Sequence, residues 1–284
     1  MTEVRNVKET VFMLPGPVKM HPRVLEVMNT PAMNHRGDEF RVVVRELREL
    51  CRYLFQSDNE VVILSGSGTA ALDAAICNLA RKNDKVLNIV NGKFSERFHE
   101  ISRVYADAKA LEFEWGKAVD PEVVAGALEQ DDYKIVTMCH NETSTGLTNP
   151  AREVGKLVRK TEALFIVDAI TSVGGLEVEP DEWGYDVTVV GSQKCLAAPP
   201  GLSLLSISKR AEELLIEDSC YYLNLKEHIR EMRDNSQTPY TPALPLFLSL
   251  REALRMLREE GLENRIARTR KLAEATRSAV KALG

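Results

Sequence analysis

The chain contains the stretch Val187-Thr188-Val189-Val190-Gly191-Ser192-Gln193-Lys194, which joins an apolar run to a lysine. A short apolar run of this kind is typical of a buried strand. A lysine at the end of such a strand is poorly placed for packing, because its ammonium group must be solvated or paired. Its amine is well placed for covalent chemistry with a carbonyl group. Lys194 is therefore the first candidate for a catalytic residue.

A second apolar run upstream, Phe165-Ile166-Val167, ends on Asp168. An amine and a carboxylate at the ends of two strands are what pyridoxal 5'-phosphate requires, namely a lysine for a Schiff base and an acid that faces the pyridinium nitrogen. Each residue also has an ordinary explanation. Asp168 could cap the segment that follows it, and Lys194 could be a surface lysine on a loop.

Short apolar runs alternate with segments of helical period through the middle of the chain, which predicts an α/β fold with a mostly parallel central sheet and helices on both faces. We expect strands at 61–64, 86–90, 110–113, 135–138, 164–167, 187–190 and 202–207, and helices at 69–80, 94–105, 121–129 and 152–160. Two longer helices are expected at 39–55 and 246–283, the second broken near Gly261. In such sheets ligands collect at the carboxyl ends of the strands.

Composition limits the class of protein. The 284 residues suffice for one large α/β domain or two ordinary ones, and 44% are hydrophobic. The net charge of −5 gives no reason to expect nucleic acid as a partner. No apolar run approaches the ~20 residues of a membrane span, and residues 1–10 lack the apolar core of a signal peptide. We therefore expect a cytoplasmic protein without a membrane segment.

The cysteines indicate reduced thiols. There are 5 of them, an odd number without CxxC spacing, at Cys51, Cys77, Cys139, Cys195 and Cys220. This pattern does not predict a disulfide framework or a zinc site, and no other group of residues has metal-ligand spacing.

Three further motifs follow predicted strands. Ser65-Gly66-Ser67-Gly68-Thr69 joins a strand to a helix, where glycines and free N–H groups can bind a phosphate, although a plain tight turn explains it equally well. Phe94 lies shortly after a strand end, where an aromatic ring could stack on a flat cofactor or simply join the core. Residues 140–146, His-Asn-Glu-Thr-Ser-Thr-Gly, form a polar loop after another strand.

Together these motifs resemble the class V aminotransferases of pyridoxal 5'-phosphate fold type I, and most closely the alanine–glyoxylate and serine–pyruvate aminotransferases. The segments that resemble the family are 14–17, 65–69, 91–94, 140–146, 167–175, 192–201 and 249–254. The resemblance extends from about Phe12 onward. It implies pyridoxal 5'-phosphate as the cofactor and a large fold type I domain.

The resemblance also implies roles for individual residues. Lys194 would bind the cofactor and move a proton at the substrate, and Asp168 would pair with the pyridinium nitrogen. Phe94 would stack on the ring, and Thr143 would bond the side of the ring that bears the 3-hydroxyl. Four residues would hold the phosphate: Ser67, Gly68, Thr69 and Gln193.

Residues outside the predicted sheet also receive roles from the resemblance. Thr238 and Thr241 of a neighbouring subunit would complete the phosphate site, which implies a homodimer with shared active sites. Thr238 stands where many relatives have tyrosine. Gly16, in the segment Leu14-Pro15-Gly16-Pro17, would line the substrate pocket.

The resemblance suggests a domain plan: an N-terminal arm at 1–20, a large cofactor-binding domain at 21–245, and a connecting helix at 246–284. Family members continue into a small C-terminal domain with an arginine for the substrate carboxylate. That domain is expected to be largely absent from this chain, so the arginine would lie beyond residue 284.

The expected activity is transfer of an amino group from a small amino acid, alanine or serine, to a small 2-oxo acid, glyoxylate or pyruvate. A cysteine desulfurase or another lyase on the same scaffold is an alternative, although such enzymes generally place histidine where this chain has Phe94. A non-catalytic truncated relative is a second alternative. A nicotinamide-dependent dehydrogenase is a third alternative. It would need an acidic residue about 20 positions after the glycine loop, where this chain has Asn88 and Val90.

Overall fold

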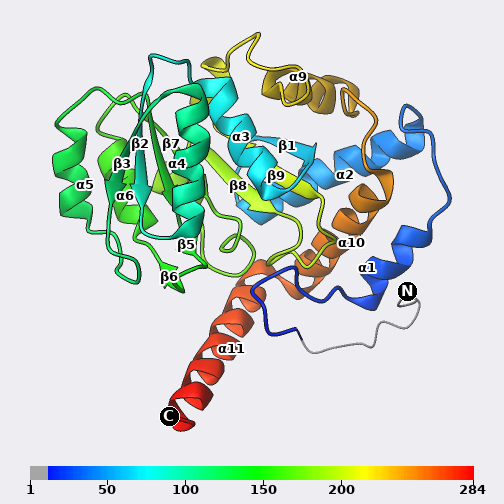
Figure 1. The fold of residues 1–284 in the computed structure, drawn as a ribbon. Coiled ribbons are helices and arrows are strands. Elements are labelled where there is room, and N and C mark those ends of the chain that lie inside the picture. Colours follow the sequence, from blue (N-terminus) through cyan, green and yellow to red (C-terminus); the bar gives the residue numbers. More distant parts are fainter. Residues whose placement is uncertain (1–11) are drawn as a thin grey trace, which may run out of the picture.

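A seven-stranded sheet forms the centre of the computed structural model, which describes residues 12–284 (Figure 1). The strands are β1 (Glu60–Ser65), β2 (Lys85–Val90), β3 (Asp107–Glu112), β4 (Ile135–Cys139), β7 (Leu164–Asp168), β8 (Val187–Gly191) and β9 (Leu202–Ile207). They lie in the order β1-β9-β8-β7-β4-β2-β3, and β9 is antiparallel to both of its neighbours while the remaining pairs are parallel. The predicted α/β fold and the seven predicted strands are confirmed.

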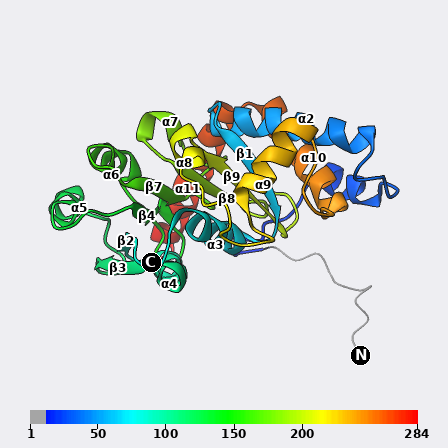
Figure 2. The ribbon, with the colours of Figure 1, turned by 90° about the horizontal axis from the view of Figure 1, so that it is seen from above.

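Helices cover both faces of the sheet, as Figure 2 shows from above. One face packs against α3 (Gly68–Leu79), α4 (Lys93–Tyr105) and α9 (Leu225–Arg230), and the other against α2 (Asp38–Phe55), α5 (Pro121–Leu128), α6 (Ala151–Val158) and α10 (Leu244–Glu260). Strand β1 shows the period of two that this requires. Val62 and Leu64 pack on the face covered by α3, α4 and α9, while Val61 and Ile63 pack on the opposite face. Central strands such as β8 are buried along their whole length.

The remaining elements complete the described part of the chain. They are α1 (Pro22–Glu26), η2 (Val27–Asn29), the β5–β6 hairpin (Asn141–Glu142 and Leu147–Thr148), α7 (Pro180–Trp183), α8 (Lys209–Glu213), η3 (Glu231–Asn235) and α11 (Leu262–Ala282). Within residues 12–284 no helix combines the length and the apolar composition that crossing a bilayer requires.

The predicted C-terminal helix is two helices. Gly261 has φ +86°, a conformation that favours glycine, and it separates α10 from α11. The N–H of Leu262 donates to the hydroxyl of Tyr53, which ties the start of α11 to α2. The rest of α11 extends away from the sheet (Figure 1). The predicted break is confirmed. The boundaries of the domain plan stay predictions. The first eleven residues of the predicted N-terminal arm lie outside the described residues.

A buried carboxylate fixes the start of α4. Glu142, which is 0% exposed, accepts hydrogen bonds from the N–H groups of Phe94 (3.3 Å) and Ser95 (2.9 Å). It also accepts from the hydroxyls of Ser95 and Ser144. Burial raises the pKa of Glu142, but the hydrogen bonds from Ser144, Ser95 and Phe94 outweigh that effect and hold it below its usual value. The negative charge also complements the positive end of the helix dipole.

We predict that Glu142→Gln lowers the free energy of unfolding at neutral pH by about 2 kcal/mol, because an amide offers one acceptor atom where the carboxylate offers two. A depressed carboxyl pKa stabilises the fold above the unfolded value of about 4.3, and this contribution is lost as the pH falls through the folded value. Urea unfolding should therefore show a difference that shrinks in acid. Glu100→Gln, on an exposed position of the same helix, is the control. Equal losses in the two variants would contradict the assignment.

Candidate active site

Loops at the carboxyl edge of the sheet enclose a cavity of about 200 Å³. All strands of the sheet except β9 run in the same direction, so the segments that follow β1, β2, β4, β7 and β8 all meet at this edge. The cavity is lined by Ser67, Gly68, Thr69, Leu72, Phe94, Arg97, Cys139, Asn141, Thr143, Asp168, Ile170, Thr171, Gln193 and Lys194. Eight of the residues that the sequence analysis singled out therefore lie around one space: Ser67, Gly68, Thr69, Phe94, Thr143, Asp168, Gln193 and Lys194.

The start of α3 forms one end of the cavity. The first amides of a helix have no intrahelical partner, and Ser67 does not cap them with its side chain. A Cβ atom on Gly68 would lie 2.4 Å from Cδ1 of Ile170, so a larger residue at this position would require the Ile170 side chain to move. Free amides at the positive end of a twelve-residue helix suit a phosphate group.

Asp168 lies at the end of β7 with 4% of its surface exposed. Its carboxylate accepts a hydrogen bond from the N–H of Ile170 at 3.0 Å. Burial raises the pKa of Asp168 to about 7, and the Ile170 N–H and the nearby Arg97 and Lys194 cations offset only part of that effect. A cationic N–H donor placed against this carboxylate would favour its charged form.

Lys194 follows β8 on a loop that internal hydrogen bonds hold in place. The buried hydroxyl of Ser192 donates to the carbonyl oxygen of Pro199 at 2.6 Å. The N-terminal segment packs against the same loop, because the N–H of Val18 donates to the carbonyl of Gln193. A Cβ atom on Gly16 would lie 2.8 Å from Nζ of Lys194, so Gly16 leaves the space that the lysine occupies.

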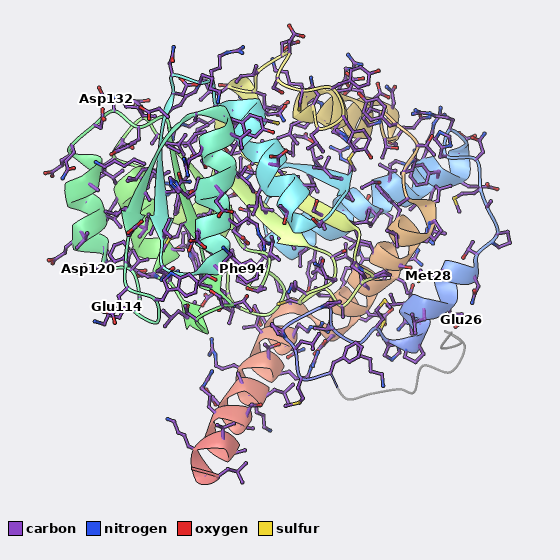
Figure 3. The ribbon with its side chains drawn as sticks, viewed as in Figure 1. Glu26, Met28, Phe94, Glu114, Asp120 and Asp132 are labelled. Atoms are coloured by element: carbon purple, nitrogen blue, oxygen red, sulfur yellow. The ribbon has the colours of Figure 1, made fainter. Side chains whose placement is uncertain are left out.

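Phe94 reaches the cavity from the first turn of α4, and Figure 3 labels it there. The guanidinium of Arg97 lies 5.1 Å from the centre of its ring, within the range of a cation–π contact. Thr143 donates its hydroxyl to Oγ1 of Thr171 at 3.0 Å, and Thr171 in turn donates to the carbonyl of Asn141.

Arg97, Asn141, Thr171 and the Glu142 cap are not among the site residues predicted from the sequence. The sequence could have indicated Arg97, because residues three apart on a helix share a face and Phe94 was already a candidate. It could not have indicated the Thr171 contact, because that contact joins two loops that only the sheet brings together.

The residues around the cavity fit pyridoxal 5'-phosphate. Free helix amides face one end, a buried carboxylate with one hydrogen bond lies deeper, and Oε1 of Gln193 is buried without a protein partner. A phosphorylated pyridinium offers a matching group for each of the first two. Within residues 12–284 no cluster of three His, Cys, Asp or Glu side chains could hold a metal ion.

Two of the predicted cofactor residues lie elsewhere in this chain. Thr238 is buried and donates its hydroxyl to the carbonyl of Tyr240 at 2.7 Å, and Thr241 is exposed. Neither lines the cavity. Their predicted role in the site of a neighbouring subunit stays a prediction.

Comparison with known proteins identifies the family. The family model "Aminotransferase class-V" matches residues 24–284. An uncharacterized aminotransferase of Methanocaldococcus jannaschii is 42% identical over 96% of this chain and 72% of its own length, and the serine–glyoxylate aminotransferase of Methylorubrum extorquens is 34% identical over 100% and 74%. The crystal structure of an alanine–glyoxylate aminotransferase from Nostoc sp. covers 100% of this chain and 79% of its own, with a TM-score of 0.92 and 32% identity. The chain therefore belongs to the class V aminotransferases, which are transaminases that depend on pyridoxal 5'-phosphate.

Proposed function

We propose that this enzyme transfers an amino group from a small amino acid, alanine or serine, to a small 2-oxo acid, glyoxylate or pyruvate. Relatives named for serine, alanine and glyoxylate support this substrate class. The observation that carries the proposal is the convergence of Lys194, Asp168 and the start of α3 on one cavity. These are a nucleophilic amine, a buried acid and a phosphate site, in the arrangement that amino-group transfer requires.

When bound, the cofactor supplies a carbonyl carbon and an electron-withdrawing ring that stores the electrons released at the substrate Cα. The Lys194 amine would hold the cofactor covalently. Once displaced, it would move a proton between the substrate Cα and C4′ of the cofactor. Asp168 would keep the ring nitrogen protonated, since a buried carboxylate favours a cationic partner. Both roles need side chains that face the same space, as these two do.

The remaining lining residues would orient the cofactor. Phe94 would stack on the ring, and Thr143 would hydrogen-bond to the side of the ring that bears the 3-hydroxyl. The phosphate would be held by Ser67, Gly68, Thr69 and Gln193. Gly16 would border the substrate, because its backbone lies against the lysine amine and leaves no room for a side chain. This placement would also shield the amine from water.

The structure offers little support for the desulfurase alternative. Such an enzyme needs a mobile thiol, and the cysteine that lines the cavity, Cys139, is buried at the end of β4. Burial raises the pKa of Cys139 well above its usual value, so its reactive thiolate is disfavoured. Phe94, rather than a histidine, lines the cavity.

We further propose a homodimer in which Thr238 and Thr241 of one subunit complete the phosphate site of the other. The exposure of Thr241 and its absence from the cavity of its own chain support this arrangement. A cytoplasmic location is proposed on the five free thiols.

The purified protein loaded with pyridoxal 5'-phosphate should transfer amine from L-alanine or L-serine to glyoxylate or pyruvate, measured by chromatography of both products. Lys194→Ala should abolish this transfer, by at least about 1,000-fold, because no other amine lines the cavity in the described residues. Lys85→Ala, whose amine pairs with Asp131 at the amino edge of the sheet, is the matched control and should retain activity. Transfer by Lys194→Ala at the normal rate would refute the assignment of the lysine.

We predict that Asp168→Asn weakens cofactor binding and transamination by about 100-fold, since a neutral amide loses a charge-assisted hydrogen bond worth about 1.5–3 kcal/mol. The raised pKa of Asp168, about 7 against about 3.9 when unfolded, has a second consequence. Its burial makes the cofactor-free protein lose stability as the pH rises between these values, and Asp168→Asn should remove that loss.

Asp186→Asn is the control for Asp168→Asn. Asp186 is also buried, but it accepts bonds from Phe165 and Ser208 away from the cavity. It should lower stability without changing cofactor affinity, measured by equilibrium dialysis. Equal effects of the two substitutions on cofactor affinity would mean that Asp168 is only a structural residue.

We predict that mixed dimers reveal the shared site. Lys194→Ala and Thr241→Glu should each be inactive alone, the second because its charge repels the phosphate. Co-expressed with distinct tags, they form hybrids with one intact site, so a random mixture should regain about a quarter of wild-type activity. If Thr241 acts within its own chain, the hybrids should regain no activity. If Thr241 has no role in the site, Thr241→Glu should be active by itself.

A further inference from the structure

Two of the five thiols lie against each other, far from the cavity. Cys77 is in the last turn of α3, and Cys220 is in the segment 214–224 between α8 and α9. Their Sγ atoms are 3.3 Å apart, although the residues are separated by 143 positions in the sequence. Within the described part of the chain, Cys51, Cys139 and Cys195 have no such thiol neighbour.

The contact is held in place by Asn78. Its side-chain amide donates to the carbonyl of Leu223 at 2.8 Å, and its Oδ1 accepts from the hydroxyl of Ser219 at 2.7 Å and from the N–H of Leu225 at 3.0 Å. These bonds fasten both sides of the Cys220 segment to α3. The two sulfur atoms therefore meet within a fixed polar frame, so that forming a bond requires only a small approach of the side chains.

The two thiols differ in access. Cys220 is partly exposed and lines an open surface pocket together with Asp218, Tyr221, Asn224, Glu227, Pro239 and Tyr240. Cys77 is 4% exposed, and burial together with the Cys220 thiol and Asp73 raises its pKa. An external reagent can reach Cys220 first, whereas Cys77 can react only with a group already attached to its neighbour.

We propose that Cys77 and Cys220 form a thiol-modification site, which low-molecular-weight disulfides such as oxidised glutathione convert to a reversible intrachain disulfide. The Cys220 thiolate attacks one sulfur of the glutathione disulfide, which forms a mixed disulfide and releases one glutathione. Cys77 then loses its proton, and its thiolate attacks the Cys220 sulfur and releases the second glutathione; its raised pKa makes this step slow, and the 3.3 Å contact between the sulfur atoms favours it. The two cysteines are oxidised, the reagent is reduced, and the two cysteine protons end on the released thiols.

The bond would join α3, whose first turn lines the cavity, to the segment that supports the loop with Thr238 and Thr241. Helix α3 begins at the Gly68–Thr69 turn of the cavity. The Cys220 segment supports Tyr240, whose hydroxyl donates to the carbonyl of Tyr221 at 3.0 Å and which lies between Thr238 and Thr241. A disulfide here would restrict both parts and close a long loop, which stabilises the fold mainly by constraining the unfolded chain.

Oxidised glutathione, added to the cofactor-loaded protein, tests the proposal. We expect two of the five thiols to be lost, the Cys77 and Cys220 peptides to be linked in mass spectrometry without reduction, and the thermal midpoint to rise by about 5 °C or more. Dithiothreitol should reverse all three changes. Cys195→Ala, which removes another partly exposed thiol, should leave the linkage intact.

Single variants separate the two steps. Cys77→Ser should retain one glutathione on Cys220, because no second thiol is present to displace it. Cys220→Ser should take up no glutathione at this site. Because Cys220 is less buried than Cys77, this variant keeps the test available if Cys77→Ser folds poorly. The proposal is overturned if the thiol count does not change, if wild-type Cys220 keeps its glutathione, if the link joins two chains, or if the thermal midpoint falls.

Discussion

The carboxylate of Asp168 is buried at the end of a central strand, and the chain gives it one backbone N–H in return. Removing a charge from water without a full set of partners is costly, which is why its pKa rises to about 7. The cavity around it is thereby prepared for a cationic group. Lys194 and the first amides of α3 line the same cavity, as the proposed cofactor site requires.

The sheet is what brings these groups together. Parallel strands direct all of their carboxyl ends to one edge, so that loops distant in the sequence meet there. Strand β9 runs in the opposite direction between β1 and β8, and its N–H and C=O groups pair on both sides. It therefore keeps the end of β1, before the Ser67 turn, and the end of β8, before the Lys194 loop, in register with each other.

A second layer of contacts keeps the edge rigid. The Glu142 carboxylate links the polar loop after β4 to the first turn of α4, which sets where Phe94 lies. Gly16 approaches Lys194 so closely that a Cβ atom would clash. Helix capping, a buried charge and steric exclusion thus together fix the side chains around the cavity. A small cavity whose walls are held in this way can orient a flat cofactor.

The sequence by itself determined the strands, the helices on both faces and the break at Gly261, because apolar periodicity and glycine conformation are local properties. The resemblance of its motifs, among them the Lys194 segment, Asp168 and the Ser67 turn, also indicated the family, which the family model confirms. The tertiary structure alone decided how these ends converge, that Glu142 caps α4, and that Cys77 meets Cys220. The Glu142–Ser95 and Cys77–Cys220 contacts join residues 47 and 143 positions apart, and no local pattern encodes a contact that only the packed sheet brings about.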